Sequence, residues 1–307
     1  MRVLILTWIM LLSLMCSNEN GPNPDPEPEV PNQARPELRD FPINQISFGS
    51  DWDFHPRWSR DSRMLAFARH DPDGGNTSIM LWHRASDVLE TILSGMRGDF
   101  SVSWSPDNLK IAFDARDEND VSQIYILTLA DKAVEQFTAM TTNVFRPDWS
   151  PDGRTILFTG SSGLYRQDID SGQRLLVTQA YGAWNPCWRP DGEKILFSSS
   201  GASDAIYSIN PDGSDLQILG NSRKPADIEV WPRWHPSGTT IVYEWFDGSE
   251  SEICIKNLNS SQENLLTQWR DCRFPDWSPD GQSIVFSYDS KLWVIDVSSL
   301  EMSLNNF

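Results

Sequence analysis

A tryptophan-centred pattern occurs six times along this chain of 307 residues. In each copy a polar turn follows the tryptophan, and then come an isoleucine or leucine seven positions after it and an aromatic residue nine positions after it. The six tryptophans, 39 to 46 residues apart, are Trp58, Trp104, Trp149, Trp188, Trp234 and Trp277. Such a period is typical of the four-stranded blades of a β-propeller. The sequence therefore predicts an all-β fold: a six-bladed β-propeller of four-stranded antiparallel blades over residues 43–307.

The turn after each tryptophan reads Ser-Pro-Asp-Gly or a variant of it. Proline sets φ at the start of such a turn and glycine takes its positive-φ position. The aspartates at this position are expected to cap turn N–H groups rather than to act in catalysis; they are Asp61, Asp107, Asp152, Asp191 and Asp280. Three copies depart from the pattern: Arg60 and Ser62 replace proline and glycine, Asn108 replaces glycine, and Ser237 replaces aspartate.

The repeated motif Pro-x-Trp-Ser-Pro-Asp-Gly-x-x-Ile-x-Phe resembles the TolB-type propeller repeat over about residues 43–304. The WD40 propeller is the structural alternative, but its Gly-His and Trp-Asp signatures are absent at the repeat positions. The resemblance specifies a fold more closely than a function, because propellers of this type serve many roles. It implies a periplasmic platform for protein interactions, as in TolB. TolB's additional α/β domain has no counterpart here, so the resemblance is limited to the propeller.

Closure of the ring can also be predicted. The segment Ile43 to Gly49 (INQISFG) aligns without gaps with VEQFTAM, which stands before Trp149. We therefore expect the N-terminal segment to form the outer strand of the last blade, which would remove an open sheet edge. The segment SLEMSLN near the C-terminus aligns with another outer strand and is the alternative. The protein is expected to be monomeric.

The first 15 residues have one early cation, Arg2, and then an apolar run, and they are predicted to be an export signal of the lipoprotein type. In such signals the cysteine that follows, here Cys16, is acylated and becomes the first residue. Met15 departs from the small residue usual before that cysteine. The alternative is a plain secretory signal. An acylated Cys16 would place the protein in the bacterial cell envelope, periplasmic or surface-exposed, with a lipid anchor as its link to the membrane.

Residues 16–42 are predicted to be an extended tether. Positions 17–42 hold seven prolines and six acidic residues against two arginines, with almost nothing apolar to bury. The whole chain carries a formal charge of -18. A surface this acidic repels phosphate backbones, so nucleic acid is not an expected partner.

The segments that lead into each first strand are expected to gather around one mouth of the central channel, where an envelope protein or peptide would bind. Three positions before the tryptophans stand six different side chains, as an asymmetric binding surface would require. In four of the six copies an aromatic residue stands one position earlier, and this regularity suggests instead that these aromatic residues pack within the blades. The predicted binding residues are Asp53, His55, Arg146, Trp184, Asn185, Trp231, Arg270 and Arg273.

Signatures of catalysis are sparse. The four histidines show no metal-ligand spacing, and no Gly-x-Ser-x-Gly elbow is present. We predict no catalytic residue, no metal and no cofactor. Beyond Cys16, the three cysteines Cys187, Cys254 and Cys272 are expected to be buried thiols, with a Cys254–Cys272 disulfide as the alternative.

Two functional hypotheses follow. The first is a non-enzymatic envelope lipoprotein that binds a protein or peptide over the channel mouth. The second is a secreted carbohydrate-active or other small-substrate enzyme, a lyase or hydrolase, using the same funnel. For the second, the available side chains are His55, His70 and the arginines of the mouth.

Overall fold

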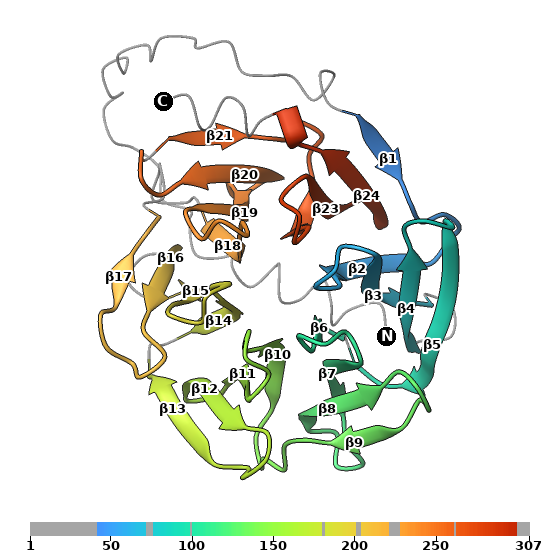
Figure 1. Ribbon diagram of the computed structural model, residues 1–307, viewed down its shortest axis with the longest axis vertical. Coiled ribbons are helices and arrows are strands. Elements are labelled where there is room, and N and C mark those ends of the chain that lie inside the picture. Colours follow the sequence, from blue (N-terminus) through green and yellow to red (C-terminus); the bar gives the residue numbers. More distant parts are fainter. Residues whose placement is uncertain are drawn as a thin grey trace, which may run out of the picture. The chain divides into compact units, whose positions relative to one another are not determined.

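The computed structural model describes residues 42–71, 76–98, 100–179, 182–200, 204–220, 228–260 and 262–299. These residues form six four-stranded antiparallel sheets arranged in a ring (Figure 1), and residues of all six inner strands line a central channel. In each sheet the strand order follows the chain from the channel outward, except in the last blade. The predicted all-β six-bladed propeller is confirmed.

The first three blades share one pattern, in which an inner strand ends at or near the repeat tryptophan. Blade 1 consists of β2 (Trp52–Trp58), β3 (Met64–His70), β4 (Thr77–His83) and β5 (Val88–Met96). Blade 2 consists of β6 (Val102–Trp104), β7 (Lys110–Arg116), β8 (Ser122–Thr128) and β9 (Val134–Gln136). Blade 3 consists of β10 (Val144–Trp149), β11 (Thr155–Gly160), β12 (Gly163–Asp168) and β13 (Arg174–Thr178).

The other three blades complete the ring. Blade 4 consists of β14 (Ala183–Trp188), β15 (Ile195–Ser200), β16 (Asp204–Ile209) and β17 (Gln217–Ile218). Blade 5 consists of β18 (Ile228–Trp234), β19 (Thr240–Phe246), β20 (Ser251–Asn257) and β21 (Glu263–Leu265). Blade 6 consists of β22 (Arg273–Trp277), β23 (Ser283–Tyr288), β24 (Lys291–Asp296) and, from the other end of the chain, β1 (Ile43–Gln45).

The hydrophobic core lies between the blades. Each repeat tryptophan is buried and packs against its own blade and the preceding one. Trp58, for example, shares a cluster with Leu65 of its own blade and with Val285 and Leu292 of blade 6. Because every blade packs one such ring against the preceding blade, the repeat itself produces a closed chain of packed sheets.

Ring closure follows the N-terminal prediction. Strand β1 pairs antiparallel with β24, with Ile43 opposite Ile295 and Gln45 opposite Trp293. The alternative closing segment, SLEMSLN, begins at Ser299 and otherwise lies outside the described residues. The last blade is therefore built from both ends of the chain.

The repeated turns have the geometry that the sequence predicts. In blade 2, Oδ1 of Asp107 accepts hydrogen bonds from Ser105 Oγ at 2.6 Å and from the Leu109 N–H at 3.0 Å. Asp152 and Asp280 repeat both bonds, so these aspartates cap the turn. Ser62 and Asn108, which replace glycine, both adopt a φ of 60°.

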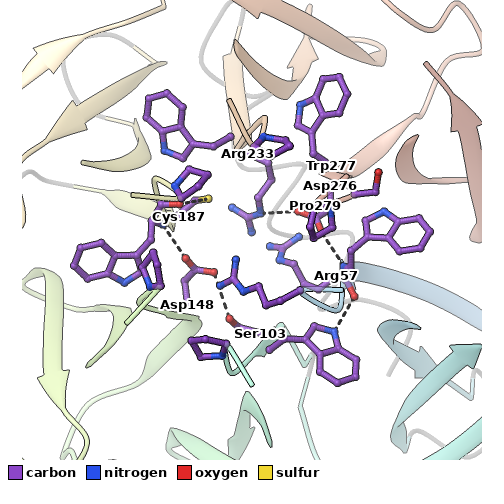
Figure 2. Close-up of a pocket in the computed structure, with 18 residues that line it drawn as sticks. Arg57, Ser103, Asp148, Cys187, Arg233, Asp276, Trp277 and Pro279 are labelled. Carbon is purple, nitrogen blue, oxygen red and sulfur yellow. Dashed lines mark hydrogen bonds and ion pairs between the residues drawn. The ribbon is translucent and has the colours of Figure 1, made fainter. Parts of the chain in front are cut away.

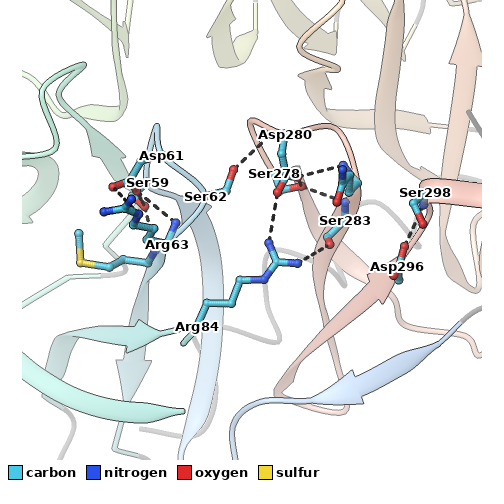
Figure 3. Close-up of polar contacts among 12 residues, drawn as sticks. Ser59, Asp61, Ser62, Arg63, Arg84, Ser278, Asp280, Ser283, Asp296 and Ser298 are labelled. Carbon is cyan, nitrogen blue, oxygen red and sulfur yellow. Dashed lines mark hydrogen bonds and ion pairs between the residues drawn. The ribbon is translucent and has the colours of Figure 1, made fainter. Parts of the chain in front are cut away.

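The departures from the repeat also join neighbouring blades. Oδ1 of Asn108 accepts a hydrogen bond from the Arg60 N–H at 2.7 Å. At the seam between blades 6 and 1, Ser62 Oγ accepts one from the Asp280 N–H at 3.1 Å, and Arg84 reaches Asp280 and Ser283 at 3.4 and 3.2 Å (Figure 3). The first repeat is therefore modified where the two ends of the ring meet.

Other sequence predictions concern thiols and the N-terminal region. Cys187, Cys254 and Cys272 are buried thiols, and no disulfide joins them. Residues 1–41, with the predicted export signal, Cys16 and nearly all of the tether, lie outside the described residues. Among the residues that are described, no helix is long and apolar enough to cross a membrane.

Candidate functional site

The inner strands share a distortion near the residues at which they begin. We call the side of the ring on which these residues lie the lead-in face. The pairing of first and second strands shifts register there in five blades, as at Phe54/Arg57 in blade 1. In the same five blades the residue three before the tryptophan has a φ between 53° and 59°: His55, Arg146, Asn185, Trp231 and Phe274. A bulge of this kind re-aims a side chain, and here the side chains meet in the channel.

These five residues and the equivalent Ser101 form what we call the lead-in cluster. The ring of His55 lies 4.7 Å from that of Trp231 and 4.4 Å from that of Phe274. The Trp231 and Phe274 rings meet edge to face at 4.7 Å. Because these rings come from blades 1, 5 and 6, their contact joins three blades at this end of the channel.

Arg146 supplies the charge of the lead-in cluster. Its guanidinium lies 4.1 Å from the ring centre of Trp231 and 5.5 Å from that of Trp184. Its Nη1 donates a 2.6 Å hydrogen bond to Asn185 Oδ1. A cation between two indole rings is held by cation–π attraction as well as by the hydrogen bond.

The remaining polar groups hold this cluster in place. Asp114 Oδ1 accepts hydrogen bonds from the Ser101 and Arg146 N–H groups at 3.0 and 3.2 Å. Glu244 accepts from the Phe274 N–H at 3.3 Å, and burial raises the pKa of Glu244 to about 7. Burial, together with the charge of Arg146, lowers the pKa of His55 well below its usual value. His55 is therefore neutral at neutral pH.

The structure brings together five of the eight predicted binding residues: His55, Arg146, Trp184, Asn185 and Trp231. Asp53 lies elsewhere, fully buried in an ion pair with Arg69 at 2.7 Å. Two others lie at the start of blade 6. Arg270 is 75% exposed and pairs with Glu250, while Arg273 is half-buried and pairs with Asp271.

A cavity of about 380 Å³ lies at the opposite end of the channel, where the repeated turns are, and we call that side the turn face. Its inner wall is made by the residues just before the tryptophans, which point into the channel (Figure 2): Arg57, Ser103, Asp148, Cys187, Arg233 and Asp276. Its mouth is made by five turn prolines and Arg60. None of these residues is among the binding residues predicted from the sequence. The signal that could have found them was the arginine that replaces a turn proline.

Charge is concentrated in this cavity. Burial raises the pKa values of Asp148 and Asp276 to about 6, although Arg57 and Arg60 act in the opposite direction. Asp148 accepts hydrogen bonds from the Trp188 N–H at 2.8 Å and from Ser103 Oγ at 3.3 Å. Burial also raises the pKa of the Cys187 thiol, which is therefore not a reactive thiolate at neutral pH.

Among the residues that the structure describes, no three His, Cys, Asp or Glu side chains gather in a group that could hold a metal ion. None of the turn aspartates belongs to such a group, and the histidine of the lead-in cluster is surrounded by aromatic rings. The two polar regions of the channel are therefore the candidate sites.

Comparisons with known proteins agree with the fold. The "Tol-Pal system protein TolB" of Acinetobacter baylyi is 31% identical over 99 residues, which are 30% of this chain and 22% of that protein. The crystal structure of TolB from Acinetobacter baumannii has a TM-score of 0.66 and 23% identity, over 76% of this chain and 59% of that one. The chain thus matches less than two thirds of either.

Enzymes share the architecture as well. A structure described as oligogalacturonate lyase in complex with manganese has a TM-score of 0.56 and 15% identity, covering 83% of this chain and 92% of that chain. At such identities, likeness shows the fold alone. The family model described as "TolB beta propeller domain" matches residues 43–227, more than half of the chain. With its six four-stranded blades and repeated tryptophan turns, the protein belongs to the TolB beta propeller domain family.

Proposed function

We propose that this protein is a non-catalytic binding protein of the bacterial cell envelope. In this proposal Cys16 carries a lipid anchor, residues 16–42 are a tether, and the propeller binds an envelope protein or peptide at its lead-in face. The observation that carries the proposal is the lead-in cluster. Six equivalent positions bear six different side chains, which converge on one end of the channel.

The chemistry of this face supports protein recognition. Aromatic and arginine side chains dominate the energetics of many protein interfaces. Trp184 is half-buried beside Arg146, and Arg270 and Arg273 lie on the lead-in segment of blade 6. The buried part of the cluster would then provide a rigid base, and these side chains would contact the partner. The similarity to a Tol-Pal system protein favours an envelope partner.

The alternative function is a carbohydrate-active enzyme, a lyase or hydrolase, since a propeller lyase has the same architecture. In that case His55 would be a candidate base. His55 packs against Trp231 and Phe274, and the whole residue is only 6% exposed. A substrate would therefore have little access to its ring, which disfavours proton transfer between them.

A pull-down from envelope extract tests the proposal. The purified protein is compared with a lead-in variant, Trp184→Ala/Arg270→Ala/Arg273→Ala, and with a turn-face variant, Arg63→Ala/Arg154→Ala/Glu193→Ala, in which all three residues are exposed. We expect one envelope protein to be captured by the wild type and the turn-face variant but not by the lead-in variant. Release of unsaturated or shortened sugars from polysaccharide, without capture, would favour the enzyme instead.

A further inference from the structure

The cavity at the turn face has an unusual surplus of buried hydrogen-bond donors. The guanidinium groups of Arg57 and Arg233 lie in the middle of the channel (Figure 2), and the two residues are only 7% and 5% exposed. Each donates through Nη1 to the carbonyl oxygen of the proline before it, at 3.0 and 2.8 Å. Within the described part of the chain, the Nε of each has no hydrogen-bond partner. The two arginines therefore retain donor capacity.

Arg60 adds a third cation at the mouth of the cavity. It occupies the position that proline holds in the other five repeats, and its Nη2 reaches across to the Trp149 carbonyl oxygen at 3.3 Å. This bond links the turn of blade 1 to blade 3. Arg60 is an exposed residue, but this bond directs its guanidinium toward the mouth of the cavity, which it lines.

The two carboxylates of the cavity are engaged with its wall. Asp148 accepts hydrogen bonds from the Trp188 N–H and Ser103. Asp276 accepts one from the Trp58 N–H at 2.9 Å and forms an ion pair with Arg233, whose Nε lies 3.8 Å from its Oδ1. Three arginines against two aspartates leave one net positive charge when all are ionised. This is notable in a chain whose formal charge is -18. A single negative charge would balance the cavity.

The shape and lining of the mouth define the rest of the ligand. Five prolines, of which Pro190 is exposed and the other four are half-buried, surround the opening: Pro106, Pro151, Pro190, Pro236 and Pro279. They form an apolar collar above the cationic interior. The volume of about 380 Å³ is near the lower end of the roughly 300–1,000 Å³ that small-molecule pockets occupy. Planar guanidinium groups also match the geometry of a carboxylate.

We propose that this cavity binds a small organic monocarboxylate, with its carboxylate held by Arg57, Arg60 and Arg233 and its body inside the proline collar. The site lies at the other end of the channel from the lead-in cluster. It does not depend on the partner-binding function proposed above, and either can fail alone.

Calorimetric titration of the full-length protein with benzoate tests the site, and benzamide serves as a neutral molecule of similar shape. We expect saturable binding of one benzoate per chain and at least tenfold weaker binding of benzamide. Arg60→Pro restores the proline of the other repeats and removes one cation, so it should weaken benzoate binding about tenfold. It also removes the N–H that donates to Asn108 Oδ1, which should lower the Tm slightly. Arg63→Gln, at a position 83% exposed in the same turn, should leave benzoate affinity unchanged.

Three results would overturn the proposal: no saturable benzoate binding to folded protein, equal affinity for benzamide, or full affinity in Arg60→Pro. If that variant lowers the Tm, Arg60→Gln provides the same comparison without a change in backbone freedom. Tighter binding of inorganic phosphate than of benzoate would show that the site prefers a dianion, contrary to its charge balance. The lead-in variant should bind benzoate normally, so that a failure of partner capture is distinguished from a failure of this site.

Discussion

The carboxylate of Asp276, in the last blade, accepts a 2.9 Å hydrogen bond from the backbone N–H of Trp58, in the first blade. The same relationship links Asp148 to Trp188 at 2.8 Å and Ser103 to Trp149 at 3.0 Å. The residue before the repeat tryptophan thus ties its blade to the next one. At Asp276 the bond joins residues 218 positions apart and supplements the pairing of β1 with β24.

Asp276→Ala should destabilise the propeller at this seam. The variant leaves the buried N–H of Trp58 without its acceptor, at a cost of about 1–3 kcal/mol in the free energy of unfolding. Asp276→Asn retains an acceptor oxygen and should recover much of that loss. Urea unfolding measures both, with the exposed turn residue Asp212→Ala as a control. Equal losses in the Ala and Asn variants would argue against the hydrogen bond.

Trp149→Ala should loosen the interface between blades 2 and 3. Trp149 packs against Ala112 and Ile124 of blade 2 and against Ile156 of its own blade. Loss of a buried aromatic ring typically costs about 3–5 kcal/mol. The exposed Trp52 is the matched control, since Trp52→Ala removes the same ring from the surface. Calorimetric melting should show a clear fall in Tm for Trp149→Ala alone, and similar Tm values for the two variants would contradict the packing.

Asp148 should make stability depend on pH in a defined direction. Because burial raises its pKa in the folded state to about 6, the folded protein binds this proton more tightly than the unfolded chain does. The free energy of unfolding therefore gains a contribution as the pH falls from 7.5 through 6 to 5. Asp148→Asn lacks that contribution, while the other titrating groups are present in both proteins.

The measurement is the difference in unfolding free energy between wild type and Asp148→Asn at several pH values. It should shift in favour of the wild type by on the order of 1–2 kcal/mol between pH 7.5 and pH 5. A constant difference, or a shift in the opposite direction, would mean that burial does not raise the pKa of Asp148 in the folded protein.

The repeat made most of the fold predictable. One tryptophan, a Pro-Asp-Gly turn or a variant of it, and an alternating strand recur at each blade, so strand number, turn chemistry and blade order follow from local pattern. Closure by Ile43–Gln45 was predictable because that segment matches another outer strand. The positive φ of His55 and Arg146 was not, because a register shift depends on how neighbouring strands pair.

The channel was harder to predict than the blades. The arginines and aspartates before the tryptophans resemble ordinary strand residues, and the repeat alone does not say that they face one another across the channel. Asp53 was predicted to bind at the channel mouth, yet it pairs with Arg69 on the adjacent strand β3. The pairing of neighbouring strands decides the role of Asp53, and contacts between blades decide the roles of the residues in the channel; the repeat pattern alone specifies neither.

Cys16→Ser tests the proposed lipid anchor. In wild-type cells the mature protein should label with a palmitate analogue and partition into detergent, since two or more acyl chains give stable attachment. The variant should remain unlabelled and be either released or retained as an unprocessed precursor. A wild-type protein that is soluble and unlabelled would contradict the anchor, while leaving the propeller's binding function open to its own test.

The central claim, that the lead-in face recognises an envelope protein, is tested most directly by affinity. The dissociation constant of the captured partner is measured for the wild type, for the lead-in variant and for the turn-face variant. The account predicts at least a hundredfold weaker binding for the lead-in variant, with a Tm close to that of wild type, and wild-type affinity for the turn-face variant. Lost affinity in the turn-face variant with full affinity in the lead-in variant would place the partner on the opposite side of the ring and contradict the account.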